Sequence, residues 1–352
     1  MKNQFKPIRR REKLPRLAEQ ITKWFNKKPS GRTISIFIDA AKAFDTVWHD
    51  GLRKMLSDAG LPIIIIRWLS SFLTNRFGKI KINEFTSREF LLKAGVPQGS
   101  IISPLLYIFY IKDLPTKVTE RMISSYYADD TSYAGSDHPH RSSKVFVTDL
   151  LQPILNDLEV HCKKWRMSLN PSKTWCINFH QNTKNRNTPH LYLSGNLLKY
   201  KKTYKFLGIT FDEKLSFNEH IKIITEKCQK RLNLLKAISC KNWGASPEII
   251  LYTYKAYIRP ILEYGCVLFA HADHSLLQKI QNIETTAIKI AYRLPPWTTN
   301  TWCYNLINFD KILDRLKKQA KQFVNKNSKD ELIAPLIAEA KASHTGNHSP
   351  LY

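Results

Sequence analysis

The sequence predicts an α+β protein in which a β-rich segment precedes an almost wholly helical one. Two observations predict this order. Alternating apolar residues and clusters of β-branched and aromatic residues recur up to about residue 213, whereas apolar residues spaced three and four apart dominate the rest of the 352-residue chain. Hydrophobic residues make up 43% of the chain and aromatic residues 11%, a composition typical of a folded protein rather than a disordered one.

The first predicted strand ends in a carboxylate. Residues 1–32 are strongly basic and contain apolar residues with helical spacing, and a strand rich in Ile and Phe follows over residues 33–38 and leads into Asp39. A charge at the end of a buried strand is costly unless it is paired or bound to a metal ion. Asp45 lies where a helix over about 46–59 should begin, so we expect it to be the N-cap of that helix.

The next segment combines a helix, a hairpin and a glycine-containing loop. We expect a helix from residue 61 to about Gly78, then a hairpin with alternating apolar residues over 79–93. Gly95, Pro97 and Gly99 form a loop before an apolar helix, with Ser103 as the expected N-cap and Pro104 at the first helical position. Such a loop suits close approach to a phosphate or a base, although an ordinary structural turn has the same composition.

Two adjacent aspartates, Asp129 and Asp130, follow a short strand expected over residues 125–128. Two interpretations account for them. They could form a solvated hairpin turn, in which Asp is a common residue. Alternatively, they could bind a hard divalent cation such as Mg²⁺, which proteins usually hold through one or two carboxylates together with substrate phosphates. Asp39 is the third carboxylate that favours the metal site.

The remaining elements complete the β-rich part and begin the helical part. We expect a long helix from about residue 145, a turn at 170–171, a strand over 174–179, and further strands up to about residue 213. Ser216 and Glu219 have the spacing of a capping box that opens a helix to about residue 238. Ser246 followed by Pro247, and Ser275 with Gln278, indicate the starts of two more helices.

The net charge indicates a polyanionic partner. The chain has 55 Lys and Arg against 29 Asp and Glu, a formal charge of +26. Basic side chains interleaved with aromatic ones favour nucleic acid, because they neutralise phosphates and stack on bases. A merely soluble basic protein is the alternative, and the basic helical part is either a nucleic-acid clamp or a plain helical appendage. The six cysteines lack zinc-site spacing, and no apolar run is long enough to span a bilayer.

Five stretches occur in the order of the motifs of a known enzyme family. "FIDAAKAFDTVWHDGL" resembles motif A, "AGVPQGSIISPLLY" motif B, "YYADDT" motif C, "WRMSLNPSKT" motif D and "YKFLGITFD" motif E of the reverse transcriptases of non-LTR retrotransposons, most closely the jockey-like group. "YIRPILEYG" and "LQKIQNIETTAIKI" resemble the region that follows the polymerase in jockey-like proteins. The likeness runs from about residue 12 to 325.

The resemblance implies a right-hand polymerase. Its palm, an antiparallel sheet with helices, is followed by a helical thumb and a helical C-terminal region. On this basis residues 1–32 are a basic remnant of the fingers, 33–213 the palm with partial fingers, 214–300 a thumb-like helical region, and 301–352 a C-terminal helical region and tail.

The resemblance also implies the catalytic residues. Asp39 and Asp129 would hold two Mg²⁺ ions, with Mn²⁺ as the alternative metal, and Asp130 would complete the carboxylate cluster. Ala40 would offer its backbone carbonyl to a metal ion. Lys173 would donate a proton to the pyrophosphate.

Substrate-binding roles follow from the same motifs. Phe44 would be the steric gate that excludes a 2'-hydroxyl, although a core phenylalanine at a helix start has the same appearance. Gln98 and Gly99 would contact the incoming nucleotide and the template. Phe206, Leu207 and Gly208 would form the primer grip.

The implied partners are an RNA template, a DNA primer and deoxynucleoside triphosphates, with no membrane and no evident protein partner. We expect an intracellular, soluble protein that acts in the nucleus or the cytoplasm as a ribonucleoprotein. The segment "QFKPIRRREKLPRL" lacks a recognisable copy of the family's "GFR...HST" fingers stretch, so we also expect an N-terminally truncated product. A second hypothesis is therefore a catalytically inactive remnant that only binds RNA or an RNA:DNA hybrid.

Overall fold

The structure is a computed structural model that describes residues 10–28, 30–138, 143–181, 188–240 and 243–327. The chain packs into two units, each discontinuous in sequence. The helical unit comprises residues 1–33, 177–186 and 202–352, and the sheet unit comprises residues 34–176 and 187–201. Mixed helices and strands confirm the α+β class, while the division into four consecutive segments stays a prediction. Among the described residues, no helix is long and apolar enough to cross a membrane.

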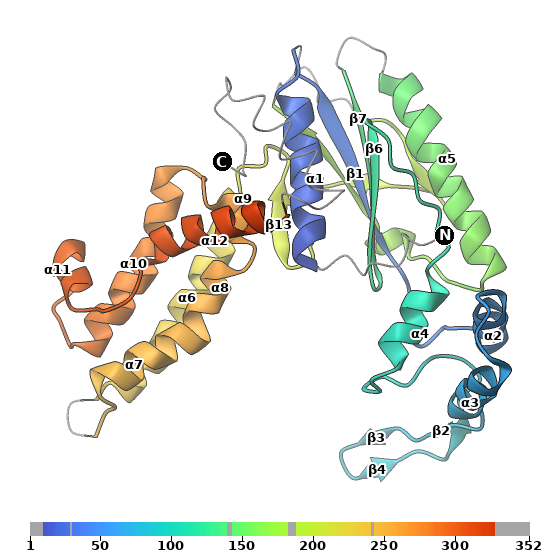
Figure 1. The fold of residues 1–352 in the computed structure, drawn as a ribbon, viewed down its shortest axis with the longest axis horizontal. Helices are drawn as coiled ribbons and strands as arrows, with labels where there is room; N and C mark the ends of the chain where they lie inside the picture. Colours follow the sequence, from blue (N-terminus) through green and yellow to red (C-terminus); the bar gives the residue numbers. More distant parts are fainter. Residues whose placement is uncertain (1–9, 29, 139–142, 182–187, 241–242, 328–352) are drawn as a thin grey trace. The chain divides into compact units, whose positions relative to one another are not determined.

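A five-stranded sheet carries the candidate site. Its strand order is β11-β8-β1-β7-β6 (Figure 1). The strands are β1 (Arg32–Asp39), β6 (Met122–Tyr127), β7 (Asp130–Asp137), β8 (Trp175–His180) and β11 (Lys199–Tyr200). β6 and β7 form an antiparallel hairpin, whereas β11 pairs with β8 in parallel. The side chains of β1 are buried up to Ile38, as expected for a central strand.

Four helices belong to the sheet unit: α2 (His49–Asp58), α3 (Ile63–Leu73), α4 (Ser103–Tyr110) and α5 (Ser143–Lys164). The core between helices and sheet contains Ile36, Leu52, Leu106 and Leu155. The predicted helix over 46–59 begins at His49 with Trp48 as its N-cap, so the expected capping role of Asp45 is wrong. Instead, the Asp45 carboxylate accepts a hydrogen bond from Gln98, 53 residues away in the sequence.

The expected hairpin over 79–93 is present as two short ladders. β2 (Phe77–Gly78) pairs with β5 (Phe90–Leu91), and β3 (Lys81–Ile82) pairs with β4 (Phe85–Thr86). The preceding helix ends at Leu73 rather than near Gly78, because β2 already begins at Phe77. β9 (Tyr192–Leu193) and β10 (Asn196–Leu197) form another short hairpin.

The start of α4 differs from the prediction by one residue. Ile102 is the N-cap, and Ser103 is already helical with Pro104 behind it, so the predicted Ser103 cap is wrong. The buried hydroxyl of Ser103 has no hydrogen-bond partner among the described residues. Helix ends predicted from sequence commonly differ by one or two residues.

The helical unit contains most of the remaining elements. They are α1 (Arg10–Phe25), β12 (Thr203–Phe206), β13 (Ile209–Asp212), α6 (Asn218–Ile238), α7 (Pro247–Thr253), a π-helical turn (Tyr254–Ile258), α8 (Arg259–Glu263), α9 (Cys266–Phe269), α10 (His274–Ala291), α11 (Asn300–Asn305) and α12 (Ile312–Asn327). The expected helix up to about residue 238 is present as α6, and its apolar residues Ile221, Ile224, Cys228, Leu232 and Leu235, spaced three and four apart, are buried.

The predicted capping box of α6 is absent. Phe217 is the N-cap and its side chain makes no cap bond, while the Ser216 hydroxyl accepts the N–H of Asn218 at 3.4 Å instead of that of Glu219. Asp212, at the end of β13, holds the turn that leads into α6. Its carboxylate accepts the backbone N–H groups of Lys214 at 3.1 Å, Ser216 at 3.0 Å and Phe217 at 2.7 Å. At α10 the N-cap is Asp273 rather than Ser275. In both helices the N-cap is a residue that the sequence pattern did not indicate.

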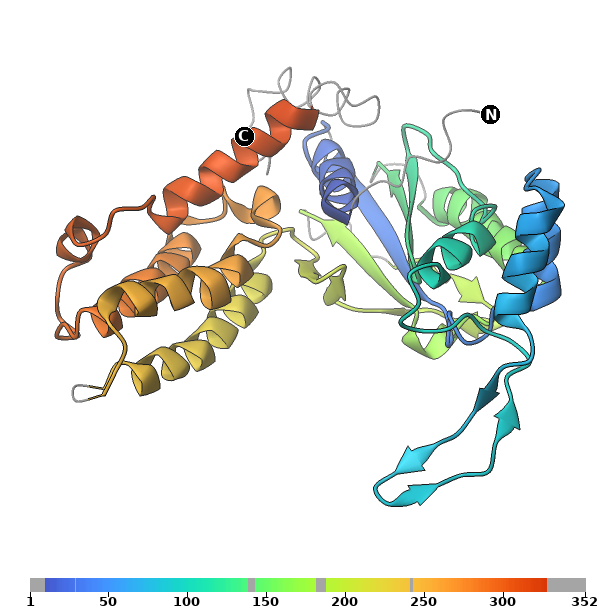
Figure 2. The same ribbon diagram turned by 60° about the horizontal axis from the view of Figure 1, so that its bottom comes forward.

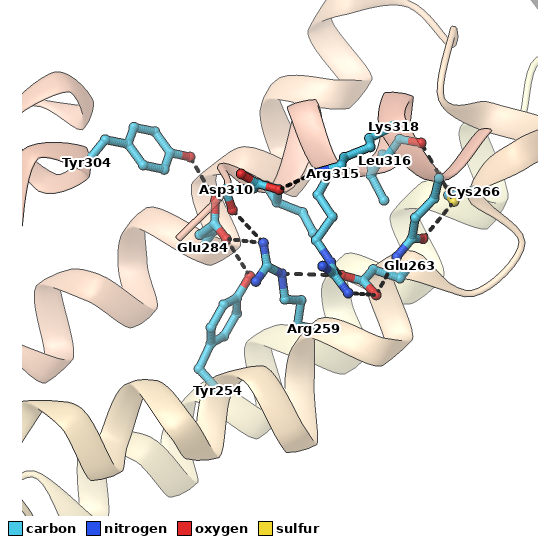
Figure 3. Close-up of polar contacts among 12 residues, drawn as sticks. Tyr254, Arg259, Glu263, Cys266, Glu284, Tyr304, Asp310, Arg315, Leu316 and Lys318 are labelled. Carbon is cyan, nitrogen blue, oxygen red and sulfur yellow. Dashed lines mark hydrogen bonds and ion pairs between the residues drawn. The ribbon is translucent and has the colours of Figure 1, made fainter. Parts of the chain in front are cut away.

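A buried carboxylate lies at the centre of the helical unit (Figure 3). Glu284 has no exposed surface, and it accepts hydrogen bonds from the Tyr254 hydroxyl at 3.2 Å, the Tyr304 hydroxyl at 3.1 Å and the Ile312 N–H at 2.6 Å. Burial raises the pKa of Glu284. Arg259, itself 5% exposed, is its cationic partner at 3.8 Å. The hydrogen bonds of Glu284 therefore hold the π-helical turn, α10, α11 and α12 together.

Glu263 joins α8 to α12. Its carboxylate lies 3.3 Å from the Nε of Arg259 in the same helix, pairs with Arg315 of α12 and accepts a hydrogen bond from Gln319 at 2.9 Å. The "YIRPILEYG" stretch therefore supplies the ionic centre of the helical unit, a structural role that its helical periodicity alone did not indicate.

A buried histidine predicts acid sensitivity of the helical unit. Burial, with a smaller effect from Lys205, lowers the pKa of His220 to about 4, and its Nδ1 accepts the Thr210 N–H at 3.3 Å. A histidine with a lowered folded-state pKa stabilises the fold above its unfolded pKa of about 6.5, and this stability is lost as pH falls toward 4. We expect a loss of about 3 kcal/mol across this window. Urea unfolding at pH values above and below the window measures it.

The matched variant is His220→Gln, which cannot be protonated. Its free energy of unfolding should fall less steeply with acidification than that of the wild type. An equal slope in both proteins would assign the acid sensitivity to other groups.

Candidate active site

The end of β1 and the turn between β6 and β7 lie at the same edge of the sheet. β1 and β7 are hydrogen-bonded neighbours, and Figure 1 shows them running in opposite directions. Asp39 is the last residue of β1, and Tyr127 pairs with Asp130, so that Ala128 and Asp129 form the two-residue turn. Residues 90 positions apart (129 minus 39) are thus brought to neighbouring strand ends. The hairpin turn and the carboxylate site are the same feature of the structure.

The turn contains backbone strain. Ala128 has a φ of 50°, in the left-handed region that favours glycine. An alanine there costs roughly 1–2 kcal/mol, and the pairing of β6 with β7 has to impose that conformation. The strained residue lies directly before Asp129, whose position it fixes.

The backbone around Asp39 is held by the segment over residues 168–174. The Asp39 carbonyl accepts the Asn170 N–H at 2.9 Å, and the Ala41 N–H donates to the Ser168 carbonyl at 2.8 Å. These two bonds flank a bridge in which Ala40 lies opposite Leu169, and the Ala40 carbonyl takes part in neither bond.

Thr174, the residue before β8, also bonds to the backbone of Asp39 and Asn170. Its Oγ1 accepts the Asp39 N–H at 3.4 Å and donates to the Asn170 carbonyl at 2.9 Å. Lys173 immediately precedes Thr174, in the short 3₁₀ helix Pro171–Lys173, with its side chain exposed. The stretch that resembles motif D is therefore hydrogen-bonded to the end of β1.

The side chains of Asp39 and Asp129 are both accessible to solvent. Asp39 is half-buried and Asp129 is exposed. Within the described residues, no Lys, Arg or His side chain forms an ion pair with either carboxylate. No group of three or more His, Cys, Asp or Glu residues in that part of the chain could hold a metal ion. The arrangement thus offers two carboxylates at neighbouring strand ends, with Asp130 next in the chain.

An aromatic pair connects Phe44 to Asp129. The ring of Phe44 stacks on Tyr107 of α4 with a centroid distance of 4.6 Å and an interplanar angle of 24°. Burial, and to a lesser extent the negative charge of Asp129, raises the pKa of Tyr107. Phe44 is partly buried and packs against the core. Its two proposed roles, core residue and gate, are both compatible with this packing.

The glycine-containing loop before α4 docks on the segment after β1. Val96 N–H donates to the Phe44 carbonyl at 2.8 Å, and Gly95 N–H donates to the Val47 carbonyl at 2.9 Å. Gln98 Nε2 donates to the Asp45 carboxylate at 2.9 Å. Gln98 and Gly99 are exposed next to this junction, so motif B is fixed to motif A by backbone and side-chain bonds.

The three residues of the predicted primer grip belong to the helical unit. Phe206 pairs with Ile209, and Leu207 and Gly208 form the turn between β12 and β13 with φ values of 48° and 87°. Positive φ at both central residues is typical of the tight turns favoured in hairpins. The Tyr264 hydroxyl donates to the Leu207 carbonyl at 2.6 Å, so the turn is supported by the "YIRPILEYG" stretch.

Sequence reasoning missed three residues of these two sites and gave Asp45 a different role. Thr174 and Tyr264 act on the backbone of a predicted site residue, and Tyr107 and Asp45 contact predicted side chains. Thr174 lies within the motif D stretch, Tyr107 ends the motif B stretch and Tyr264 lies within "YIRPILEYG", so all three were inside segments already singled out. Tyr107 was passed over because an aromatic residue in an apolar helix is usually core.

Comparison with known proteins supports the sequence resemblance. A family model described as "Reverse transcriptase (RNA-dependent DNA polymerase)" matches residues 3–211. The probable RNA-directed DNA polymerase from transposon BS of Drosophila melanogaster is 28% identical over 318 residues, which are 89% of this chain and 34% of that protein. The RNA-directed DNA polymerase from the mobile element jockey of the same species is 27% identical over 302 residues, 83% of this chain and 32% of that protein.

More distant similarities extend to other elements and to a solved structure. The Pol polyprotein from the type-1 retrotransposable element R2 of Popillia japonica is 24% identical over 68% of this chain and 39% of that protein. The structure of apo telomerase from Candida tropicalis is 11% identical with a TM-score of 0.41, covering 93% of this chain and 56% of that one. The chain spans about a third of the length of the transposon BS and jockey proteins.

Two glycines of the loop before α4 provide a matched test of the junction. A Cβ at Gly95 would lie 2.8 Å from the Asp45 carbonyl oxygen, whereas a Cβ at Gly99 would meet nothing within 4 Å, and both residues have a φ near +90°. Gly99→Ala should cost roughly 1–2 kcal/mol of backbone strain. Gly95→Ala should cost more, because the loop must also move off Asp45. Thermal unfolding of the two variants checks this order, and equal losses would contradict the close contact.

Proposed function

Because the chain belongs to the reverse transcriptase (RNA-dependent DNA polymerase) family, we propose that it extends a DNA primer on an RNA template with deoxynucleoside triphosphates. The single observation that carries the proposal is the meeting of Asp39 and the Ala128–Asp129 turn at neighbouring strand ends. The sheet unit would be the palm, and the helices after residue 216 would be the thumb. The net charge of +26 supports a nucleic-acid partner.

Asp39 and Asp129 would hold Mg²⁺ or Mn²⁺, with Asp130 and the Ala40 carbonyl as further oxygen donors. The donor set fits a hard divalent cation, which needs oxygen ligands and is usually completed by substrate phosphates rather than by an all-protein cage. The absence of a protein cation beside either carboxylate among the described residues supports the same assignment. When bound, two such ions lower the pKa of the primer 3'-hydroxyl and stabilise the charge of the departing pyrophosphate.

The chain's own residues position the reactants. Hydrogen bonds from residues 168–174 hold the backbone of Asp39, so its carboxylate can face a cation without displacing the strand. Lys173, exposed beside Thr174, would donate a proton to the pyrophosphate as it leaves. Gln98 and Gly99 would contact the incoming nucleotide and the template, from a loop already tied to Asp45. The Phe206, Leu207 and Gly208 turn would hold the primer.

Phe44 would select deoxynucleotides. A ring stacked on buried Tyr107 cannot easily move aside, so a 2'-hydroxyl that meets it would be excluded by overlap rather than by a lost hydrogen bond. The proposal gives Tyr107 a positioning role behind Phe44.

One observation favours a second function. In the described part of the chain, three carboxylates are not gathered into a metal-binding group. A protein that binds RNA or an RNA:DNA hybrid through its basic surface, without catalysis, would have the same charge and the same fold. Primer extension would require Asp39 and Asp129, whereas nucleic-acid binding alone would not.

Primer extension with carboxylate variants separates these functions. We expect Asp39→Asn and Asp129→Asn to reduce extension by roughly 10²–10³-fold or more, since each removes a charge that acts on the transition state. Asp58→Asn is the matched control, because Asp58 is an exposed carboxylate paired only with Lys54 on α2. Hybrid binding by all variants should remain within about twofold of the wild type, an effect far below the catalytic loss. Binding without extension by the wild type would favour the second function.

Ribonucleotide discrimination tests the aromatic pair. Phe44→Val should raise incorporation of ribonucleotides relative to deoxynucleotides by roughly 10- to 100-fold, the range expected for relieving overlap in an apolar pocket. Tyr107→Phe keeps the stacked ring and should leave the ratio unchanged, whereas Tyr107→Ala should raise it as Phe44→Val does. The ratio of incorporation rates is the measurement, and an unchanged ratio in Phe44→Val would show that Phe44 is only a core residue.

A further inference from the structure

Large aromatic side chains are exposed at one end of the helical unit. The structure describes all eight tryptophans of the chain, and four of them are exposed: Trp68 at 59%, Trp243 at 72%, Trp297 at 83% and Trp302 at 47%. Trp243, Trp297 and Trp302 belong to the helical unit and are together called the tryptophan surface below. Because an indole is among the most costly side chains to leave in water, this exposure needs an explanation.

Hydrogen bonds bring the segments that carry these tryptophans together. Arg293, just after α10, donates from Nε to the Ser239 carbonyl at 3.2 Å and from Nη2 to the Cys240 carbonyl at 2.9 Å, just after α6. The C-terminal ends of α6 and α10 therefore meet. Trp243 follows Cys240 by three residues and Trp297 follows Arg293 by four, which limits their Cα atoms to about 10 and 14 Å from the linked residues.

Local hydrogen bonds hold residues next to both tryptophans. After α6, the Gly244 N–H donates to the Cys240 carbonyl at 2.8 Å. After α10, Lys289 Nζ donates to the Pro296 carbonyl at 2.7 Å, and Trp297 comes next in the chain. α11, which carries Trp302, packs against α10. Figures 1 and 2 show the ends of α6 and α10, the start of α7, and α11 at the same end of the helical unit.

The sequence around Trp243 and around Trp297 is basic. The sequence contains no acidic residue between Glu226 and Glu248, nor between Glu284 and Asp310. The first interval includes four basic residues of α6, Lys227, Lys230, Arg231 and Lys236, and the second includes Lys289 and Arg293. A partner of complementary charge is a polyanion, and a second copy of this chain, with its own charge of +26, would be repelled.

We propose that the tryptophan surface binds single-stranded nucleic acid by stacking unpaired bases on Trp243 and Trp297. Indole rings beside basic side chains are the combination that recognises an unpaired polyanionic strand, because rings contact base faces and cations contact phosphates. Tryptophan is also common in protein interfaces, and it is the net charge of +26 that favours a polyanion as the partner. The site lies outside the sheet unit that contains Asp39 and Asp129, so it adds a binding function to the proposed polymerase rather than a part of its chemistry.

The test compares binding of an unstructured fluorescein-labelled oligouridine with binding of a blunt RNA duplex, by anisotropy. The Trp243→Ala/Trp297→Ala double variant should bind the single strand roughly 5- to 100-fold more weakly, with little change for the duplex, whose bases are already stacked. The Trp243→Phe/Trp297→Phe variant keeps two aromatic faces and should retain most of the affinity. Trp68→Ala, a change of an exposed tryptophan in the sheet unit, is the control and should bind as the wild type does.

Both rings are exposed, so their truncation should leave the fold intact, and circular dichroism of the double variant verifies this. Unchanged oligouridine binding by the double alanine variant would overturn the proposal, as would equal losses for single strand and duplex. Asp129→Asn, which removes a residue of the proposed polymerase site, should bind oligouridine as the wild type does. Failure of the stacking site is thereby distinguishable from failure of the proposed polymerase function.

Discussion

The pairing of β1 with β7 is the interaction on which the candidate site depends. It joins strands whose nearest functional residues are 90 positions apart (129 minus 39), and it brings a strand end to a hairpin turn. Side chains alternate between the two faces of a sheet, so a shift of one residue in this pairing would turn Asp39 to the opposite face. The buried side chains of β1 oppose such a shift, because they would have to exchange packed positions.

Backbone contacts fix both carboxylates while their side chains stay accessible. Residues 168–174 hold Asp39 from one side, and the loop before α4 holds residues 44–47 from the other. Asp129 is fixed by a strained turn rather than by a side-chain partner. Two carboxylates at neighbouring strand ends repel each other, and a rigid backbone prevents the structure from relaxing that repulsion. A divalent cation is the group that would relieve it.

The elements carried by local patterns could be predicted from the sequence. The strand over 33–38, the hairpin around Asp129 and the apolar face of α6 each follow from periodicity within a few residues. The helix caps could not be predicted in the same way, and the capping roles expected for Asp45, Ser103 and Ser216 were wrong. Asp45 is bound by Gln98, and the turn before α6 is held by Asp212. Local sequence patterns do not reveal such distant partners. Buried Glu284 was missed for the same reason: a carboxylate on a helix resembles a surface residue until its partners are known.

The central claim is that Asp39 and Asp129 together hold a divalent cation, and ferrous iron tests it most directly. Fe²⁺ that replaces Mg²⁺ generates hydroxyl radicals in the presence of ascorbate and peroxide, and these cleave the nearby backbone. The account predicts cleavage next to both Asp39 and Asp129, suppressed by excess Mg²⁺ and lost in Asp129→Asn. Cleavage near only one of the two residues, or elsewhere in the chain, would contradict a shared cation site.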